Sequence, residues 1–155
     1  MKGFTITEIV EMAVQAERLG YKFYTAMSKR FKKQKELKEL FDTLAEKEKV
    51  HEKRFESLKD FVIKREPEDW QEAQKYFRAI MESEFFIGKR KSLPSMSNIK
   101  TEKDAVGLAI GFEKETLLFY IGLRGEIREK HILDEIIKEE QSHITWLTSI
   151  LGRLS

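Results

Sequence analysis

The sequence contains EKVH at residues 48–51 and EQSH at residues 140–143, which are two copies of the pattern Glu-x-x-His. Side chains three residues apart lie on the same face of an α-helix, so each copy would direct one carboxylate and one imidazole toward the same place. The chain has only 3 histidines, and two of them occur in these copies. The pair therefore indicates a functional cluster rather than a coincidence.

Each copy lies within a stripe of apolar residues whose spacings of three and four are typical of an amphipathic helix. Each of these two stripes is preceded along the chain by another stripe with the same spacing, which carries no Glu-x-x-His copy. The four stripes run from Ile6 to Met27, from Leu37 to Val62, from Val106 to Tyr120 and from Leu133 to Leu154. Strand-like alternation is almost absent, so we expect an all-α protein with four long helices. We expect Thr5 or Thr7 to cap the first helix, and Thr101 with Asp104 to cap the third.

The stretch between the second and third stripes is too long for a turn. Short turns join the first helix to the second and the third to the fourth, whereas residues 63–100 form a long connector. We expect an extra helix over residues 68–87, following Pro67, that crosses back along the bundle. One crossover is the connectivity of a ferritin-like four-helix bundle. We therefore predict a single domain over residues 1–155, with helical pairs at 5–62 and 102–152.

Composition narrows the chemistry and the partners. The chain has no cysteine, which excludes disulfides, thiol catalysis, iron–sulfur clusters and a rubredoxin-type iron centre, so a metal must bind oxygen and nitrogen. The net charge of +2 gives no reason to expect nucleic acid as a partner. Glu8, Glu11 and Glu17 interrupt the first apolar stretch, so we expect neither a signal peptide nor a membrane span, and a cytoplasmic location.

Each stripe carries one glutamate at an inward position near its middle, and these four residues are Glu17, Glu48, Glu113 and Glu140. Four carboxylates in a dry interior cost several kcal/mol per ion unless cations balance them. No position on the four stripes is basic. Two divalent ions would balance the four negative charges, and the neutral imidazoles of His51 and His143 would complete the coordination. The sequence thus predicts a di-metal site.

An internal repeat supports a centre with approximate two-fold symmetry. The segments ERLGYKFY at 17–24 and EKETLLFY at 113–120 align with Glu, Phe and Tyr in register. From the first glutamate to the Glu-x-x-His copy there are 31 residues in the front half and 27 in the back half. The two halves thus differ in the length of the turn and share the arrangement of the site.

Two Glu…Phe-Tyr segments, each followed by Glu-x-x-His and separated by a long connector, resemble the rubrerythrin-type diiron domain of the ferritin-like superfamily over nearly the whole chain. The resemblance implies two iron ions, for which manganese or zinc is a chemical alternative. It also implies that Glu48 and Glu140 bridge the two irons. Glu17 and His51 would complete the coordination of one iron, and Glu113 and His143 that of the other. Tyr24 and Tyr120 would be candidate catalytic side chains that hydrogen-bond ligand carboxylates.

The same resemblance implies a non-haem diiron oxidoreductase that reduces hydrogen peroxide or O2. Because the cysteine-containing rubredoxin tail is absent, electrons would come from a separate donor protein such as a rubredoxin. We also expect the chain to form a homodimer. Thr116 stands where peroxidase-type members carry a further ligand glutamate. This difference favours ferroxidase activity, so one alternative is a ferroxidase or an iron-binding or storage protein with the same ligands. A separate alternative is a purely structural or interaction bundle, which metal analysis of the purified protein would distinguish.

Overall fold

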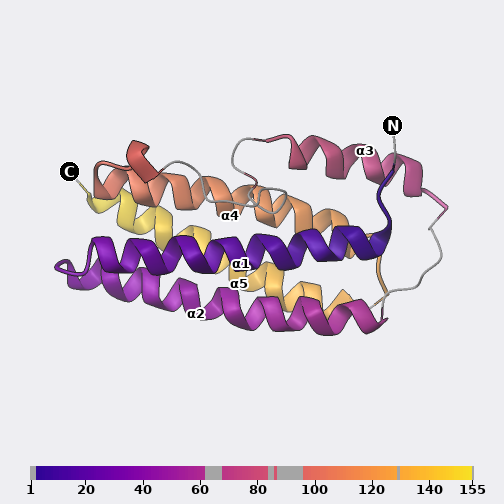
Figure 1. The fold of residues 1–155 in the computed structure, drawn as a ribbon, viewed down its shortest axis with the longest axis horizontal. Coiled ribbons are helices and arrows are strands. Elements are labelled where there is room, and N and C mark those ends of the chain that lie inside the picture. The colour runs from indigo at the N-terminus through magenta and orange to yellow at the C-terminus, as the bar shows by residue number, and fades with distance from the viewer. Residues whose placement is uncertain (1–2, 62–67, 84–85, 87–95, 129, 155) are drawn as a thin grey trace.

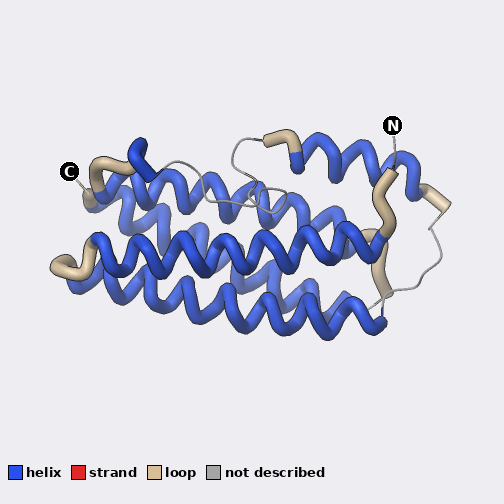
Figure 2. The backbone as a smooth tube through the Cα atoms, viewed as in Figure 1, coloured by secondary structure: helices blue, strands red, loops and turns tan. Residues whose placement is uncertain are grey.

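The computed structural model describes residues 3–61, 68–83, 86, 96–128 and 130–154. These residues form five α-helices and two short 3-10 turns, and no strand occurs among them (Figure 2). The helices are α1 (Ile6–Arg30), α2 (Lys35–Leu58), α3 (Trp70–Met81), α4 (Glu102–Arg124) and α5 (Lys130–Arg153), and the 3-10 turns are η1 (Lys59–Phe61) and η2 (Met96–Asn98). The expected all-α class is confirmed.

Four of the helices form a bundle (Figure 1). α1 packs along α2, and α4 packs along α5, with further contacts between α1 and α4 and between α2 and α5. α2 and α4 run in the same direction, so the chain between them must cross the length of the bundle. α3 lies within this crossover and packs on α4. The predicted ferritin-like four-helix bundle, with one crossover that contains an extra helix, is therefore confirmed.

The extra helix is shorter than the predicted span of 68–87. α3 begins at Trp70 and ends at Met81, where the chain turns. The turn brings Phe86 into the interior, where its ring stacks on Phe119 with 4.9 Å between centroids. The buried Phe86 ring thus lies beyond the end of α3 and not on it.

The starts of two helices have the expected caps. The Thr5 hydroxyl accepts a hydrogen bond from the Glu8 backbone N–H at the start of α1. At the start of α4, Thr101 and Asp104 bond to each other's backbone N–H groups in a capping box. These bonds satisfy backbone donors that have no partner within the helix, and they fix where each helix begins.

The apolar core is divided into two clusters. One contains Phe23, Phe41 and their neighbours, and the other contains Phe55, Phe119 and their neighbours. α4 departs from its predicted stripe, because Leu117 is only half-buried whereas Thr116 and Phe119 are buried. The clusters close the two ends of a layer of buried polar side chains.

The chain before α1 holds α3 in place. The Trp70 indole N–H donates to the Phe4 carbonyl at 2.8 Å, and the Phe4 backbone N–H donates to Gln74 at 2.7 Å. The single domain over residues 1–155 stays a prediction, and connector residues 62–67, 84–85 and 87–95 lie outside the described part of the chain. Among the helices described, none has the length and apolar character that a membrane crossing requires.

Candidate metal centre

The six predicted ligands all lie in the interior, between the two apolar clusters. Each is at most 5% exposed, and the set comprises Glu17, Glu48, His51, Glu113, Glu140 and His143. No lysine or arginine is buried in the part of the chain that the structure describes. Four buried carboxylates therefore lack a buried protein cation, apart from any proton on the histidines, which is the charge imbalance that the sequence analysis anticipated.

Glu140 stands between the two histidines. Its Oε1 lies 2.9 Å from Nδ1 of His51, and its Oε2 lies 3.6 Å from Nδ1 of His143. The two imidazole rings are roughly parallel, with 6.3 Å between their centroids. Each oxygen of one carboxylate thus faces a different histidine, which is the arrangement expected of a ligand shared by two cations.

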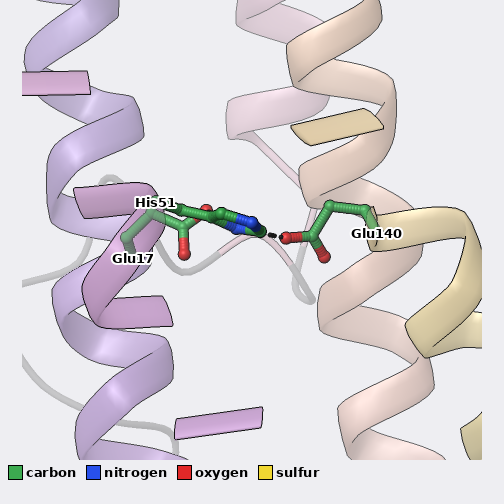
Figure 3. Close-up of side chains that lie close together, drawn as sticks. All are labelled: Glu17, His51 and Glu140. Atoms are coloured by element: carbon green, nitrogen blue, oxygen red, sulfur yellow. Dashed lines mark ion pairs between the residues drawn. The ribbon is translucent and has the colours of Figure 1, made fainter. Parts of the chain in front are cut away.

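The ligand atoms form two groups that share Glu140. Glu17, His51 and Glu140 offer one set of donor atoms within 4.8 Å of one another, and Glu113, Glu140 and His143 offer the other. In the first group, Oε1 of Glu17 lies 3.6 Å from Nδ1 of His51. Figure 3 shows how Glu17 and His51 come from one side of the bundle and meet Glu140 from the other. Each group supplies nitrogen and carboxylate oxygen, a donor set that suits iron, manganese or zinc.

Several atoms of these groups are buried without a hydrogen-bond partner. They are Oε2 of Glu17, both carboxylate oxygens of Glu140, and Nδ1 of His51 and of His143. Although Nδ1 of His51 is close to Oε1 of Glu140, the two atoms are not aligned as donor and acceptor. Unsatisfied buried polar atoms destabilise a fold, and their convergence on shared positions is accounted for by cations bound there. The residues therefore fit a pair of metal ions.

Glu48 is buried beside Glu17 but belongs to neither group. Burial and the neighbouring carboxylates of Glu17 and Glu140 raise the pKa of Glu48 well above its usual value. The ionised form of Glu48 is destabilised by this environment, and a nearby cation would stabilise it. The bridging role that the resemblance implies for Glu48 stays a prediction.

His51 carries part of the missing positive charge when no metal is bound. Burial opposes a charge on its ring, but the carboxylates of Glu140 and Glu17 outweigh burial and raise the pKa of His51 to about 11. Metal ligation requires the neutral imidazole, so an incoming cation must displace this proton.

Two tyrosines link the halves of the bundle in a crossed pattern. The Tyr24 hydroxyl on α1 donates to Oε1 of Glu113 on α4 at 2.5 Å, and the Tyr120 hydroxyl on α4 donates to Oε1 of Glu17 on α1. Burial, assisted by the nearby carboxylates, raises the pKa of both phenols well above 10, so they remain protonated donors. Each bond fixes the orientation of one carboxylate, while a catalytic role for either tyrosine stays a prediction.

Sequence reasoning missed Glu139, which supports His51 from outside the site. Nε2 of His51 is hydrogen-bonded to Oε2 of Glu139 at 2.5 Å, and the Glu139 side chain is 30% exposed. Carboxylate partners of this kind fix the orientation of a ligating histidine and make it a stronger donor. The one available signal is its place directly before the second motif, and the internal repeat hides it because the first motif has Lys47 there.

Replacing Glu139 should weaken one metal position selectively. We expect Glu139→Ala to lower the affinity of the ion held by Glu17 and His51 about 10–100-fold, because the histidine loses its carboxylate partner. Anaerobic titration with Fe²⁺ measures the two positions as separate phases. Glu135→Ala is the matched control, since Glu135 is 64% exposed on the same helix and lies 3.4 Å from Arg54, which also lies near Glu139. Equal weakening of both phases would contradict the assignment.

Comparison with known proteins agrees with this geometry. A sequence model of the rubrerythrin family matches residues 8–151. The fold is similar to the crystal structure, at 2.30 Å resolution, of a protein from Thermotoga maritima provisionally described as a ferritin-like diiron-carboxylate protein. The two chains share 23% identity with a TM-score of 0.71, over 99% of this chain and 98% of that one. No curated protein matches the chain. Since the family match spans nearly the whole bundle and all six candidate ligands, the chain belongs to the rubrerythrin family.

Proposed function

We propose that the chain is a non-haem diiron oxidoreductase that reduces hydrogen peroxide or O2. The observation that carries the proposal is the Glu140 carboxylate, whose two oxygens face the two buried histidines. Membership of the rubrerythrin family supports iron as the metal and redox chemistry as the activity. The ligands of the proposal are Glu17, Glu48, His51, Glu113, Glu140 and His143.

The chain's own residues would hold the ions and keep the site ordered. Two bound ferrous ions would supply the two electrons that, with two protons, convert one molecule of hydrogen peroxide into two of water. The four carboxylates favour the higher charge of the oxidised site. Tyr24 and Tyr120 restrain Glu113 and Glu17 through their hydrogen bonds. The apolar clusters at both ends of the layer limit the access of water.

The electrons for further cycles must come from outside the chain. It has no cysteine and therefore no iron–sulfur or rubredoxin centre of its own. We include in the proposal a separate electron-donor protein, such as a rubredoxin. The homodimer and the cytoplasmic location expected from the sequence also remain predictions.

Anaerobic loading with Fe²⁺, followed by mixing with hydrogen peroxide or with O2, tests the proposal. We expect two ions per chain, near-ultraviolet absorbance from ferric iron on mixing, and consumption of one hydrogen peroxide for every two ions oxidised. Loading with fewer than two ions, or no oxidation by either reagent, would overturn it. Size-exclusion chromatography provides a separate check, because a hollow multi-subunit shell would indicate iron storage instead.

A further inference from the structure

Gly20 occupies an unusual place, inside α1 and one turn after the candidate ligand Glu17. Glycine in the interior of a helix is destabilising relative to alanine. The backbone gives no reason for it, because no glycine in the described residues has a positive φ. The reason must therefore lie in the space that a side chain would fill.

That space holds the carboxylate of Glu48. A Cβ atom at residue 20 would lie 2.8 Å from Oε2 of Glu48 and 3.0 Å from its Cδ. Both distances are shorter than van der Waals contact allows, so a side chain here would have to displace the carboxylate. Glu48 is only 5% exposed, so its carboxylate is surrounded by other buried groups.

The second half of the chain differs at this point. Gly20 follows Glu17 by three residues, and the residue in the same place after Glu113 is Thr116, which is buried and carries a Cβ. The carboxylates of the two motifs differ as well, because Glu140 takes part in both ligand groups and Glu48 in neither. The glutamate of the first motif, Glu48, thus lies against a glycine in the preceding helix, whereas the matching position in the second half is Thr116.

We infer that Gly20 is a positioning residue that determines where the Glu48 carboxylate stands and, through Glu48, how tightly the site binds iron. The inference rests on the proposed function, since it takes Glu48 as a ligand. Alanine at position 20 would push the carboxylate out of its space and toward the other acidic side chains. Binding of Fe²⁺ should then weaken at least tenfold.

The test compares Gly20→Ala with Gly107→Ala in the metal-free and iron-loaded protein. Gly107 is the matched control, because it also lies inside a helix and a Cβ there would meet nothing within 4 Å. Gly107→Ala should raise the melting temperature by about 2–4 °C through helix propensity and leave Fe²⁺ affinity unchanged. The melting temperature of Gly20→Ala should be lower than that of Gly107→Ala by at least about 2 °C. In anaerobic titration, the Fe²⁺ affinity of Gly20→Ala should fall at least tenfold.

A Glu48→Ala background isolates the contact. There the obstructing carboxylate is gone, so adding Gly20→Ala should raise the melting temperature of the metal-free protein by about 2–4 °C, like the control. An equal shift in both backgrounds, or unchanged Fe²⁺ affinity in Gly20→Ala, would overturn the inference. If the unmodified protein binds no iron, the proposed function fails, yet the melting temperatures still report whether Gly20 and Glu48 are coupled.

Discussion

Glu140→Ala is expected to abolish the binding of both iron ions. Glu140 contributes an oxygen to each ligand group, so its loss leaves each group with one carboxylate and one histidine. The substitution also removes the carboxylate that both Nδ1 atoms face. The iron content of protein loaded anaerobically and then desalted measures the effect, which we expect to be a fall from two ions per chain to none.

His51→Ala is the informative comparison, because His51 belongs to only one of the two groups. It should lose one ion and retain the other, while the exposed control Glu135→Ala retains both. Glu48→Ala should also lose both ions if the bridging role implied by the family resemblance holds. One ion retained by Glu140→Ala would mean that Glu140 is not the shared ligand. No ion retained by His51→Ala would mean that the two groups do not bind their ions separately.

The fold follows from sequence features that act locally. Spacings of three and four residues define the buried face of a helix, and hydrogen-bonding side chains at Thr5 and at Thr101 define two helix starts. The long connector between the helical pairs then leaves a crossover as the way to complete the bundle. The length of α3 was not predicted correctly, because periodicity does not mark its end at Met81, and the buried contact of Phe86 with Phe119 joins segments far apart in the sequence.

The positions of the candidate ligands were predictable for the same reason, since periodicity alone turns Glu17, Glu113 and Glu140 inward. How the side chains meet across the bundle was not, because it depends on the rotation and separation of neighbouring helices. Periodicity places Glu48 and Glu140 at equivalent inward positions. In the structure the Glu48 carboxylate lies against Gly20, whereas the Glu140 carboxylate lies between the two histidines.

Glu139 was missed on different grounds. It lies beside the buried stripe and is partly exposed, so its sequence position is typical of a surface glutamate. Its contact with His51 joins residues 88 positions apart, on α5 and α2. Partners of ligands of this kind are found by geometry, because a single carboxylate has no periodic pattern of its own.

The charge of the site links its chemistry to the stability of the fold. Without metal, the interior holds four acidic side chains. Burial and the neighbouring carboxylates raise the pKa of Glu48, and the protonated His51 ring supplies positive charge beside Glu140 and Glu17. Unpartnered buried atoms on Glu17, Glu140 and His143 add to the cost. This arrangement destabilises the metal-free bundle, and the cations of the proposed function would restore that free energy to the folded state.

Removing iron with a chelator should accordingly lower the melting temperature by at least about 8–16 °C. One ion present at a thousand times its Kd adds about 4 kcal/mol to the free energy of unfolding, and each kcal/mol shifts the melting temperature of a chain this long by about 2–4 °C. The second ion adds to this shift. Differential scanning calorimetry of iron-loaded and chelated protein measures the shift. Glu140→Ala, which should hold no iron, is the control and should melt at the same temperature with and without chelator. A chelator effect of equal size in both proteins would show that the stabilising ions bind elsewhere, whereas loss of the effect in the variant alone would place them among the four buried carboxylates.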